Sequence, residues 1–479
     1  MNWESKDLKR ELSSILNPNQ VFTDPMELSC YSYDTSFYSA INPHMPQAVV
    51  SPKSLQDVVE LIKWAGQKQC PIIPRGAATG QAGGTLAISG GIVLDLSSWN
   101  EIESIEPQNK MVFCRPGVTY AKLNQALEPH GLYLPPDPSS GDACTIGGMA
   151  ANNSSGPRSL KHGALSNYVL GLEVVLGTGE VLVTGGVKGK VLKNVSGLNL
   201  NSLFLGSEGI LGIITGIWLA VAKKPRARAA VVMIFDKAET AQKASQEIES
   251  RGVVPAAMEF VYCAPEATRA AASFYEELYV PGAEIEIICE VDGNEESVTW
   301  EYTKLQEVAK EYAQASRGSN EPHGIHELWE INDNIEGFSA SIREGAKRIA
   351  ASEDVCVKLE KLPKILREIQ LIAKQNGIGI VNFGHWAKGH IHSGLLAKVE
   401  DPGEVDAAFR TADEIHRLVL QEGGATTAEH GVGFVRAPYM LEEHENGLDW
   451  MVKIKEALDP FHILNPGKIC PLETRKESD

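Results

Sequence analysis

The sequence predicts a protein of mixed helices and strands, an α+β fold, and three observations point to it. The 479 residues are too many for one hydrophobic core, so we expect two or three domains. Helical patterns alternate with short apolar strands as far as about Ala222, as in a layered α/β domain. After the linker Lys223–Arg226 the order becomes strand, helix, strand, strand, helix, which is typical of a ferredoxin-like layer.

Three helices are predicted in the first domain. Residues 1–16 read as an amphipathic helix that mixes acidic and basic side chains, unlike a signal or transit peptide. Apolar residues recur at helical spacing over 54–69, where Ser54 and Asp57 form a plausible capping box. Thr119 is suited to open the next helix.

Short strands are expected between these helices. Apolar runs at 70–73 and 91–96 enclose a glycine-rich loop, and a further strand is expected near 112–115. Residues 171–176 and 180–183 read as two strands joined by the tight turn Gly177–Gly179. The first domain therefore combines parallel-type connections with a hairpin.

The second domain follows the linker. Its predicted elements are strands at 229–235, 256–262 and 284–291, helices at 237–250 and 295–313, a helix at 362–375 and a strand at 378–383. Two last helices are expected at 405–421 and 448–458. We expect this part to be a separate α+β layer.

Composition excludes several classes of function. The formal charge is −18, which argues against nucleic acid and against an anionic membrane surface. The eight cysteines contain no C-x-x-C, so a disulfide framework or an iron–sulfur cluster is not expected. No apolar run reaches membrane-spanning length. We expect a cytoplasmic protein, peripheral to a membrane at most through a partner.

The glycine-rich loops are the main signal for a ligand. In the loop 74–84 four glycines remove the Cβ atoms that would keep an anion away from backbone N–H groups, and Arg75 suits a phosphate. Similar loops stand at 145–156 and 205–214, each beside an apolar strand. One such loop alone is usually an ordinary turn, but three together favour a dinucleotide. A Rossmann fingerprint and a P-loop are both absent.

A resemblance to a known family joins these motifs. In chain order stand PRGAATGQAGG, PPDPSSGDACTIGGMAANNSSG, YVLGLEVVLGTGEVL, LGSEGILGIIT and LDPFHILNPGK. This series resembles the vanillyl-alcohol-oxidase-like flavoproteins, in the branch of the glycolate oxidase large subunit, D-lactate dehydrogenases and D-2-hydroxyglutarate dehydrogenases. The resemblance implies a split two-subdomain FAD-binding fold of the PCMH type with a cap. We expect the FAD domain at 1–222, the cap at 223–422, and a return to the FAD domain at 423–479.

The resemblance also implies cofactor contacts. Residues expected to hold or line FAD are Arg75, Gly76, Ala77, Ala78, Thr79, Gly80, Gln81, Pro135, Asp137, Thr145, Gly148, Ala151, Asn153, Gly156, Glu208, Gly209, Gly212, Ile213 and Asn465. No His or Cys stands where relatives attach flavin covalently, so we expect non-covalent FAD.

Three histidines between 385 and 392 indicate a second site. A turn over Trp386–Gly389 would place His385 opposite His390, with His392 diagonal to it. The motif Thr427–Gly431 then supplies a carboxylate and another imidazole. One such histidine alone is most often a satisfied core residue, but the cluster favours a divalent metal such as Zn²⁺.

The resemblance maps the metal ligands onto His385, His392 and Glu429, and the general base onto His430. Residues 387–390 read Ala-Lys-Gly-His where the family has Gly-Asp-Gly-Asn. A lysine beside a cation is electrostatically costly unless it points away, and His390 could compete as a ligand.

The chemistry of a 2-hydroxy acid fits these groups. Hydride leaves Cα for flavin N5, and an imidazole near neutral pKa suits the hydroxyl proton. Arg343 matches the carboxylate-binding arginine of the branch, and Lys358 is a weaker match. The alternative for Arg343 is a surface ion pair with Glu344 or a helix neighbour. We expect oxidation of D-lactate, glycolate or D-2-hydroxyglutarate to the 2-oxo acid.

Electrons would pass to an electron-transfer flavoprotein, a quinone or an iron–sulfur subunit. Three alternatives stay open at this point: a flavin-holding subunit of a larger redox complex, oxidation of another alcohol in the same fold, and a metal-dependent hydrolase with structural glycine loops.

Overall fold

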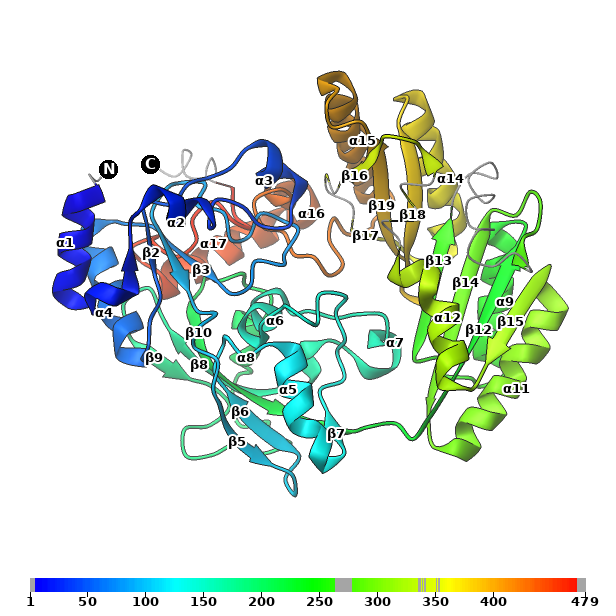
Figure 1. Cartoon of the computed structure of the whole chain (residues 1–479), viewed down its shortest axis with the longest axis horizontal. Coiled ribbons are helices and arrows are strands. Elements are labelled where there is room, and N and C mark those ends of the chain that lie inside the picture. Colours follow the sequence, from blue (N-terminus) through cyan, green and yellow to red (C-terminus); the bar gives the residue numbers. More distant parts are fainter. Residues whose placement is uncertain are drawn as a thin grey trace. The chain divides into compact units, whose positions relative to one another are not determined.

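The structure is a computed structural model that describes residues 5–262, 278–334, 337, 339, 342–349, 351 and 354–471. It contains two compact units (Figure 1). The first comprises Met1–Gly156, Gly163–Lys224 and Glu429–Asp479, and the second comprises Pro157–His162 and Pro225–Ala428. The domain limits predicted from the sequence, 1–222, 223–422 and 423–479, stay a prediction, because these units describe compactness alone.

A four-stranded sheet forms one half of the first unit. Its strand order is β1-β2-β4-β3, in which β2, β4 and β3 run parallel and β1 is antiparallel. The strands are β1 Val21–Phe22, β2 Ala48–Val50, β3 Ile72–Arg75 and β4 Ile92–Asp95, and the helices are α1 Ser5–Ile15, α2 Pro25–Ser29, α3 Phe37–Ile41 and α4 Leu55–Lys68.

Helix α4 begins at the capping box that the sequence predicted and buries one apolar face. The Ser54 hydroxyl accepts the N–H of Asp57, and the Asp57 carboxylate accepts the N–H of Ser54, so the predicted capping box is present. Its apolar face packs with α1 and the sheet in one core that includes Leu61 and Ile62, both fully buried. Residues 1–4 of the predicted N-terminal helix lie outside the described residues.

A five-stranded antiparallel sheet forms the other half, in the order β5-β6-β10-β8-β9. The predicted hairpin is present, with Glu173 opposite Val183, and Thr119 caps helix α5. The strands are β5 Ile102–Glu106, β6 Met111–Cys114, β8 Val169–Val175, β9 Val181–Val183 and β10 Ile213–Ala220; β7 Leu132–Tyr133 pairs with β11 Ala222–Lys223; the helices are α5 Tyr120–Leu127, α6 Ile146–Asn152 and α8 Asn201–Phe204.

The C-terminal part of the chain completes the first unit. Helices α16 Met440–His444 and α17 Asn446–Leu458 precede an extended segment that lies beside β3. There the Ile72 N–H donates to the Ile463 oxygen at 2.7 Å, and the Asn465 N–H donates to the Ile72 oxygen at 2.8 Å. Residues near 464 therefore act as a further parallel partner of β3.

One large antiparallel sheet organises the second unit. Its order is β15-β12-β14-β13-β18-β19-β16, and β17 also pairs with β19. The strands are β12 Ala227–Phe235, β13 Ala257–Tyr262, β14 Ile285–Gly293, β15 Ala315–Ser319, β16 Lys347–Ile349, β17 Val355–Cys356, β18 Gly379–His385 and β19 His390–Ala397; the helices are α7 Ser159–His162, α9 Ala238–Ser250, α11 Glu295–Tyr312, α12 Pro322–Asp333, α14 Leu362–Gln375 and α15 Pro402–Gln421.

The predicted strand–helix–strand–strand–helix order is thus present in β12, α9, β13, β14 and α11, and the β18–β19 hairpin widens this layer. Helix α12 packs on one face of the sheet, where Leu328 and Trp329 join Ile288 and Val381 in a core. The α+β fold class is confirmed. Within the described ranges, no helix combines the length and apolarity needed to span a membrane.

Candidate active site

The three glycine-rich loops meet in the first unit. A Cβ atom on Gly76 would lie 2.2 Å from Thr145 Oγ1, so the first loop touches the start of α6. The N–H groups of Gly206 and Glu208 donate to the oxygens of Ala150 and Ala151, at 3.1 and 2.9 Å. Loops far apart in the sequence therefore share one place in the fold.

Asn465 ties two of these loops together. Its Nδ2 donates to the oxygens of Gly84 and Glu208 at 2.9 and 2.8 Å, and the residue is 1% exposed. Its Oδ1 has no hydrogen-bond partner among the residues that the structure describes. A buried acceptor without a donor is costly, so this atom suits an N–H or O–H of a bound group such as FAD.

The remaining predicted cofactor residues are distributed around these loops. Gly76, Ala77, Ala78, Thr79, Gly80 and Gln81 follow β3; Pro135 and Asp137 precede α6; Thr145 caps α6, which contains Gly148 and Ala151; Asn153 ends α6 and Gly156 approaches Asp137; Gly209, Gly212 and Ile213 lead into β10. Ile213 is fully buried in the core, so its side chain supports the fold.

Two predicted cofactor residues have other partners. The Arg75 guanidinium donates to the backbone oxygen of Tyr33 at 2.7 Å and lies 5.3 Å from the ring centre of Tyr31. The Glu208 carboxylate accepts the N–H groups of Val432 and Gly433 at 2.6 and 2.7 Å. Both side chains brace loops, and a contact of either with FAD remains a prediction.

The environment of Glu208 is strongly perturbed. Burial raises its pKa to about 7, although the two backbone N–H groups and nearby Lys468 favour the charged form. Lys468 is 1% exposed, donates to the Leu86 oxygen at 2.8 Å, and has a pKa that burial lowers to about 7. These groups connect the Leu86 loop, the Glu208 loop and the loop that follows His430.

The predicted histidine hairpin is present in the second unit. Strand β18 ends at His385, a short turn covers Trp386–Lys388, and β19 begins at His390. Gly389 takes φ +67°, and a Cβ there would lie 2.0 Å from the Val357 oxygen, so the turn requires glycine. Phe383 pairs with His392 in the register, which puts His385 across from His390 as predicted.

The three imidazoles are buried and close together. His385, His390 and His392 are 7%, 2% and 6% exposed. Their ring centroids are 4.3 Å apart for His390 and His392, 4.8 Å for His385 and His390, and 5.9 Å for His385 and His392. Buried imidazoles from two neighbouring strands are a suitable donor set for a borderline divalent ion.

Two buried carboxylates hold these rings. His385 Nδ1 lies 2.7 and 2.8 Å from the two Glu259 oxygens, and His390 Nε2 lies 2.5 Å from Asp354 Oδ1. Asp354 Oδ2 also accepts the Thr427 hydroxyl at 2.5 Å and the Ala428 N–H at 3.2 Å. The carboxylates fix how the rings are turned and add negative charge that a cation would balance.

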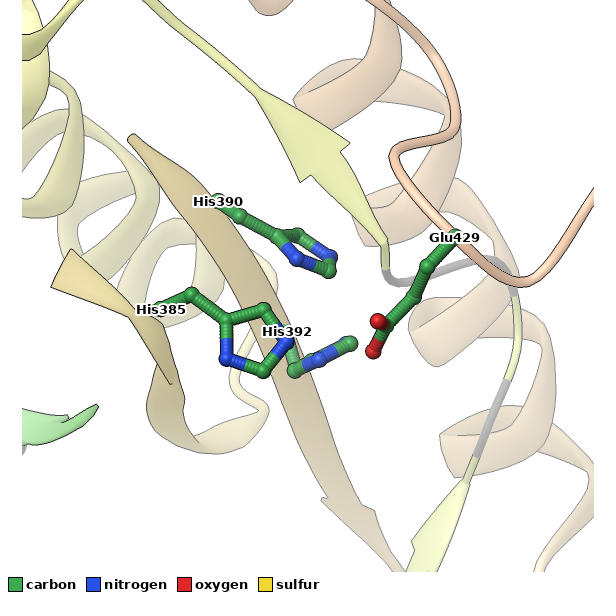
Figure 2. A group of neighbouring side chains, drawn as sticks. All are labelled: His385, His390, His392 and Glu429. Atoms are coloured by element: carbon green, nitrogen blue, oxygen red, sulfur yellow. The ribbon is translucent and has the colours of Figure 1, made fainter. Parts of the chain in front are cut away.

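Glu429 and His430 directly follow Ala428, whose N–H is held by Asp354. Figure 2 shows the Glu429 carboxylate and the three imidazoles directed toward one another, and one ligand atom from each of the four residues lies within 4.8 Å of the others. Asp354 and His392 form a second such set with His430. The His430 Nε2 lies 4.0 Å from Glu429 Oε1.

The lysine of the altered turn has a partner on α7. Lys388 Nζ donates to the Ser159 hydroxyl at 2.7 Å. The ammonium group of Lys388 therefore points to a hydroxyl on another element. A lysine beside a metal site was expected to be tolerated only if it pointed away from the metal.

The predicted carboxylate-binding residues lie on other elements. The Arg343 guanidinium donates to the Leu396 oxygen at 2.9 Å and pairs with Glu404 at 2.8 Å. Lys358 is exposed and precedes a short turn before α14. Arg343 thus forms an ion pair, as the alternative from the sequence expected, but its partner is Glu404. A role in substrate binding remains a prediction for both Arg343 and Lys358.

Sequence reasoning did not find Glu259, Asp354 or the bracing role of Glu208. Glu259 and Glu208 contact residues more than a hundred positions away, and Asp354 is 36 residues from His390. No motif surrounds Glu259 or Asp354. Their contacts with His385 and His390 can be recognised only once the pairing of the strands is known.

Comparison with known proteins assigns the class. Residues 46–185 match the family described as FAD binding domain, and residues 224–469 match the family described as FAD linked oxidases, C-terminal domain. The chain belongs to the FAD-linked oxidases.

Several relatives cover almost the whole chain. The glycolate oxidase subunit GlcD of Bacillus subtilis is 32% identical, over 98% of this chain and 98% of the relative. The D-lactate dehydrogenase of Archaeoglobus fulgidus is 31% identical over 88% and 90%. The D-2-hydroxyglutarate dehydrogenase of Stutzerimonas stutzeri is 28% identical over 96% and 98%. The predicted resemblance is confirmed, and the chain is an oxidoreductase of this group.

A solved structure confirms the fold. The 4-ethylphenol oxidase from Gulosibacter chungangensis superposes with a TM-score of 0.76, at 20% identity, over 98% of each chain. The p-cresol methylhydroxylase superposes with a TM-score of 0.75 at 17% identity, over 98% of this chain and 97% of the other. The PCMH-type fold predicted from the sequence is therefore correct.

Proposed function

We propose that this protein oxidises a D-2-hydroxy acid, of the D-lactate, glycolate or D-2-hydroxyglutarate type, to the 2-oxo acid. The observation that carries the proposal is the buried cluster of three imidazoles, followed by Glu429–His430, in a chain with an FAD-binding domain. Relatives named for these three substrates support it. A hydrolase would have no use for FAD.

FAD would be held non-covalently by the three loops. Residues 76–84 contain neither His nor Cys, the side chains that attach flavin covalently, and Asn465 Oδ1 supplies a buried acceptor. When bound, FAD supplies the acceptor for the hydride that leaves the substrate Cα. The glycine loops contribute backbone N–H groups and close approach.

Side chains of this protein would handle the proton and the carboxylate. His430 would take the hydroxyl proton, so that the substrate loses one hydride and one proton and becomes the 2-oxo acid. Arg343 and Lys358 would bind the substrate carboxylate. His385, His392 and Glu429 would hold a divalent metal, Zn²⁺ by preference, which supplies polarisation of the hydroxyl and carboxylate oxygens.

Electrons would leave through another molecule. A relative is named as a subunit of glycolate oxidase, which favours an acceptor protein, an electron-transfer flavoprotein or an iron–sulfur subunit, over a free quinone. The same name supports the second candidate, a flavin-holding subunit that works only in a complex. Turnover of the isolated chain with an artificial dye would exclude that candidate.

The test is anaerobic bleaching of the flavin by D- and L-forms of lactate and 2-hydroxyglutarate and by glycolate. We expect bleaching by one D-acid or glycolate, and removal of metal by a chelator should slow it at least about tenfold because electrostatic stabilisation is lost. His430→Ala should slow it by about 10²–10⁴ while FAD content is kept.

His323→Ala is the matched control, because His323 is 86% exposed on α12. It should bleach at the wild-type rate. Equal rates for His430→Ala and wild type would contradict the base assignment, and bleaching by a simple alcohol alone would indicate another substrate class.

A further inference from the structure

His390 has the same kind of surroundings as His385. One nitrogen of each ring is taken by a buried carboxylate, Glu259 for His385 and Asp354 for His390, which are 5% and 0% exposed. A metal-bound histidine almost always donates its other ring N–H to a carboxylate, a carbonyl or water. The pattern that marks His385 as a ligand therefore marks His390 as well.

Each of these two rings has a second nitrogen that does not contact its carboxylate. Nδ1 of His385 and Nε2 of His390 are the atoms at the carboxylates, which leaves His385 Nε2 and His390 Nδ1 as possible metal donors. Figure 2 shows the His390 ring beside those of His385 and His392. One ligand atom from each of the four residues lies within 4.8 Å of the others. Nitrogen ligands of one zinc ion lie about 3.3 Å apart, so a bound metal would draw these atoms closer together.

Charge supports the same assignment. Glu259 and Asp354 are buried carboxylates at the cluster, and Glu429 adds a third beside it. A divalent cation on three imidazoles would offset this negative charge inside the protein, where buried charges are paired or coordinate metals. Lys388, the nearest basic residue in the hairpin turn, is directed to Ser159 instead.

We propose that His390 is a third imidazole ligand of the metal and that Asp354 positions it. This inference rests on the proposed function for the presence of a metal, and it goes beyond the pair His385 and His392. Three imidazoles and one carboxylate favour Zn²⁺, Co²⁺ or Ni²⁺ over the oxygen-preferring Mg²⁺ and Mn²⁺.

Asp354 gives this centre a second connection. Its backbone has φ 130°, a region that L-residues rarely adopt, and its Oδ2 holds Thr427 and Ala428 directly before Glu429. One carboxylate therefore orients His390 and fixes the segment that delivers the carboxylate ligand. Loss of Asp354 should weaken both the imidazole and the carboxylate donors.

The experiment measures Zn²⁺ binding to metal-free, FAD-loaded protein by competition with a chromophoric chelator. His390→Gln places an N–H near the former Nε2 position for Asp354 and removes the Nδ1 ligand nitrogen, and His323→Gln is the control at an exposed site. We expect His390→Gln to weaken Zn²⁺ binding by at least about 10–100-fold, and the control to leave it unchanged. Circular dichroism checks the fold of each variant.

A direct measurement on the unmodified protein makes the result independent of folding of the variant. X-ray absorption of the Zn²⁺-loaded wild-type protein counts imidazole ligands, and we expect three. Two imidazoles, wild-type affinity in His390→Gln, or no stoichiometric Zn²⁺ in the wild type would each overturn the inference. Bleaching of the flavin is scored separately, so a failed proposed function and a failed metal assignment are distinguishable.

Discussion

At the scale of single residues, Arg343 has two possible roles: it can tie structural elements together, or it can bind the carboxylate of the substrate. Its guanidinium is anchored between the Leu396 oxygen and Glu404, and the Glu404 carboxylate also accepts the Lys398 N–H. Hydrogen bonds from Lys398 and Arg343 hold the pKa of Glu404 below its usual value. An arginine used in this way is a structural tie at the start of α15.

A pair of variants separates the structural tie from substrate binding. If Arg343 binds the substrate carboxylate, Arg343→Ala should raise KM for the acid by about 10–100-fold, because a charge-assisted hydrogen bond is lost. Glu404→Gln removes the negative charge opposite Arg343 and should leave KM close to the wild-type value. Steady-state kinetics with a dye acceptor measures both. Equal changes in KM in the two variants would show that Arg343 acts through the fold.

At the scale of elements, helix α7 is fastened to strand β14. The Glu290 carboxylate is fully buried and accepts from Arg158 at 2.8 and 2.9 Å, from Arg228 at 3.0 Å and from Trp329 at 2.8 Å. Two residues further along β14, burial would raise the pKa of Asp292, but hydrogen bonds from His162 and Lys161 lower it to about 2. Glu290 and Asp292, on one face of β14, thus hold residues 158–162. This segment lies in the sequence between the second and third glycine-rich loops.

We expect Glu290→Gln to lower the apparent free energy of unfolding by about 3 kcal/mol, because Arg158 and Arg228 lose their buried counter-charge. Urea denaturation followed by tryptophan fluorescence measures the change. Glu247→Gln is the control, since it breaks the more exposed pair with Arg251 on α9 and should change stability little. A result for Glu290→Gln as small as that of the control would mean that the ion pairs of Glu290 contribute little to stability.

Local signals explain which elements could be predicted from the sequence. The capping box of Ser54 and Asp57, the cap at Thr119 and the turn over Trp386–Gly389 each act within a few residues, and the structure contains all three. Partners that meet through sheet pairing carry no such signal. Glu259 reaches His385 only because β13 pairs with β18, so no spacing rule could reveal it.

At the scale of the whole molecule, one buried acid makes stability depend on pH. Glu286 lies on β14 opposite Ile234 and Val261, and its Oε1 has no hydrogen-bond partner within the described part of the chain. Burial raises its pKa to about 8. Between the ordinary carboxyl pKa and about 8 the folded state keeps a proton that the unfolded state has lost, so the free energy of unfolding falls as pH rises.

Glu286→Gln, which cannot ionise, should remove this part of the pH dependence. We expect little difference from wild type near about pH 5, and a variant more stable by on the order of a few kcal/mol above about pH 8. Urea titrations at both pH values measure it, with Glu330→Gln on the exposed side of α12 as control. A wild-type slope in Glu286→Gln would place the pH dependence elsewhere.

The pairing of β3 with residues near Leu464 has a consequence for biosynthesis. The four-stranded sheet gains its last neighbour from the end of the chain, whereas residues 225–428 of the second unit are contiguous. The ribosome synthesises the chain from its N-terminus. Residues 225–428 of the second unit can therefore fold before residues 429–479, which complete the first unit, have been made. A chain cut before Glu429 would keep all three glycine loops but would lack Asn465. We therefore expect such a truncated chain to lose its bound flavin.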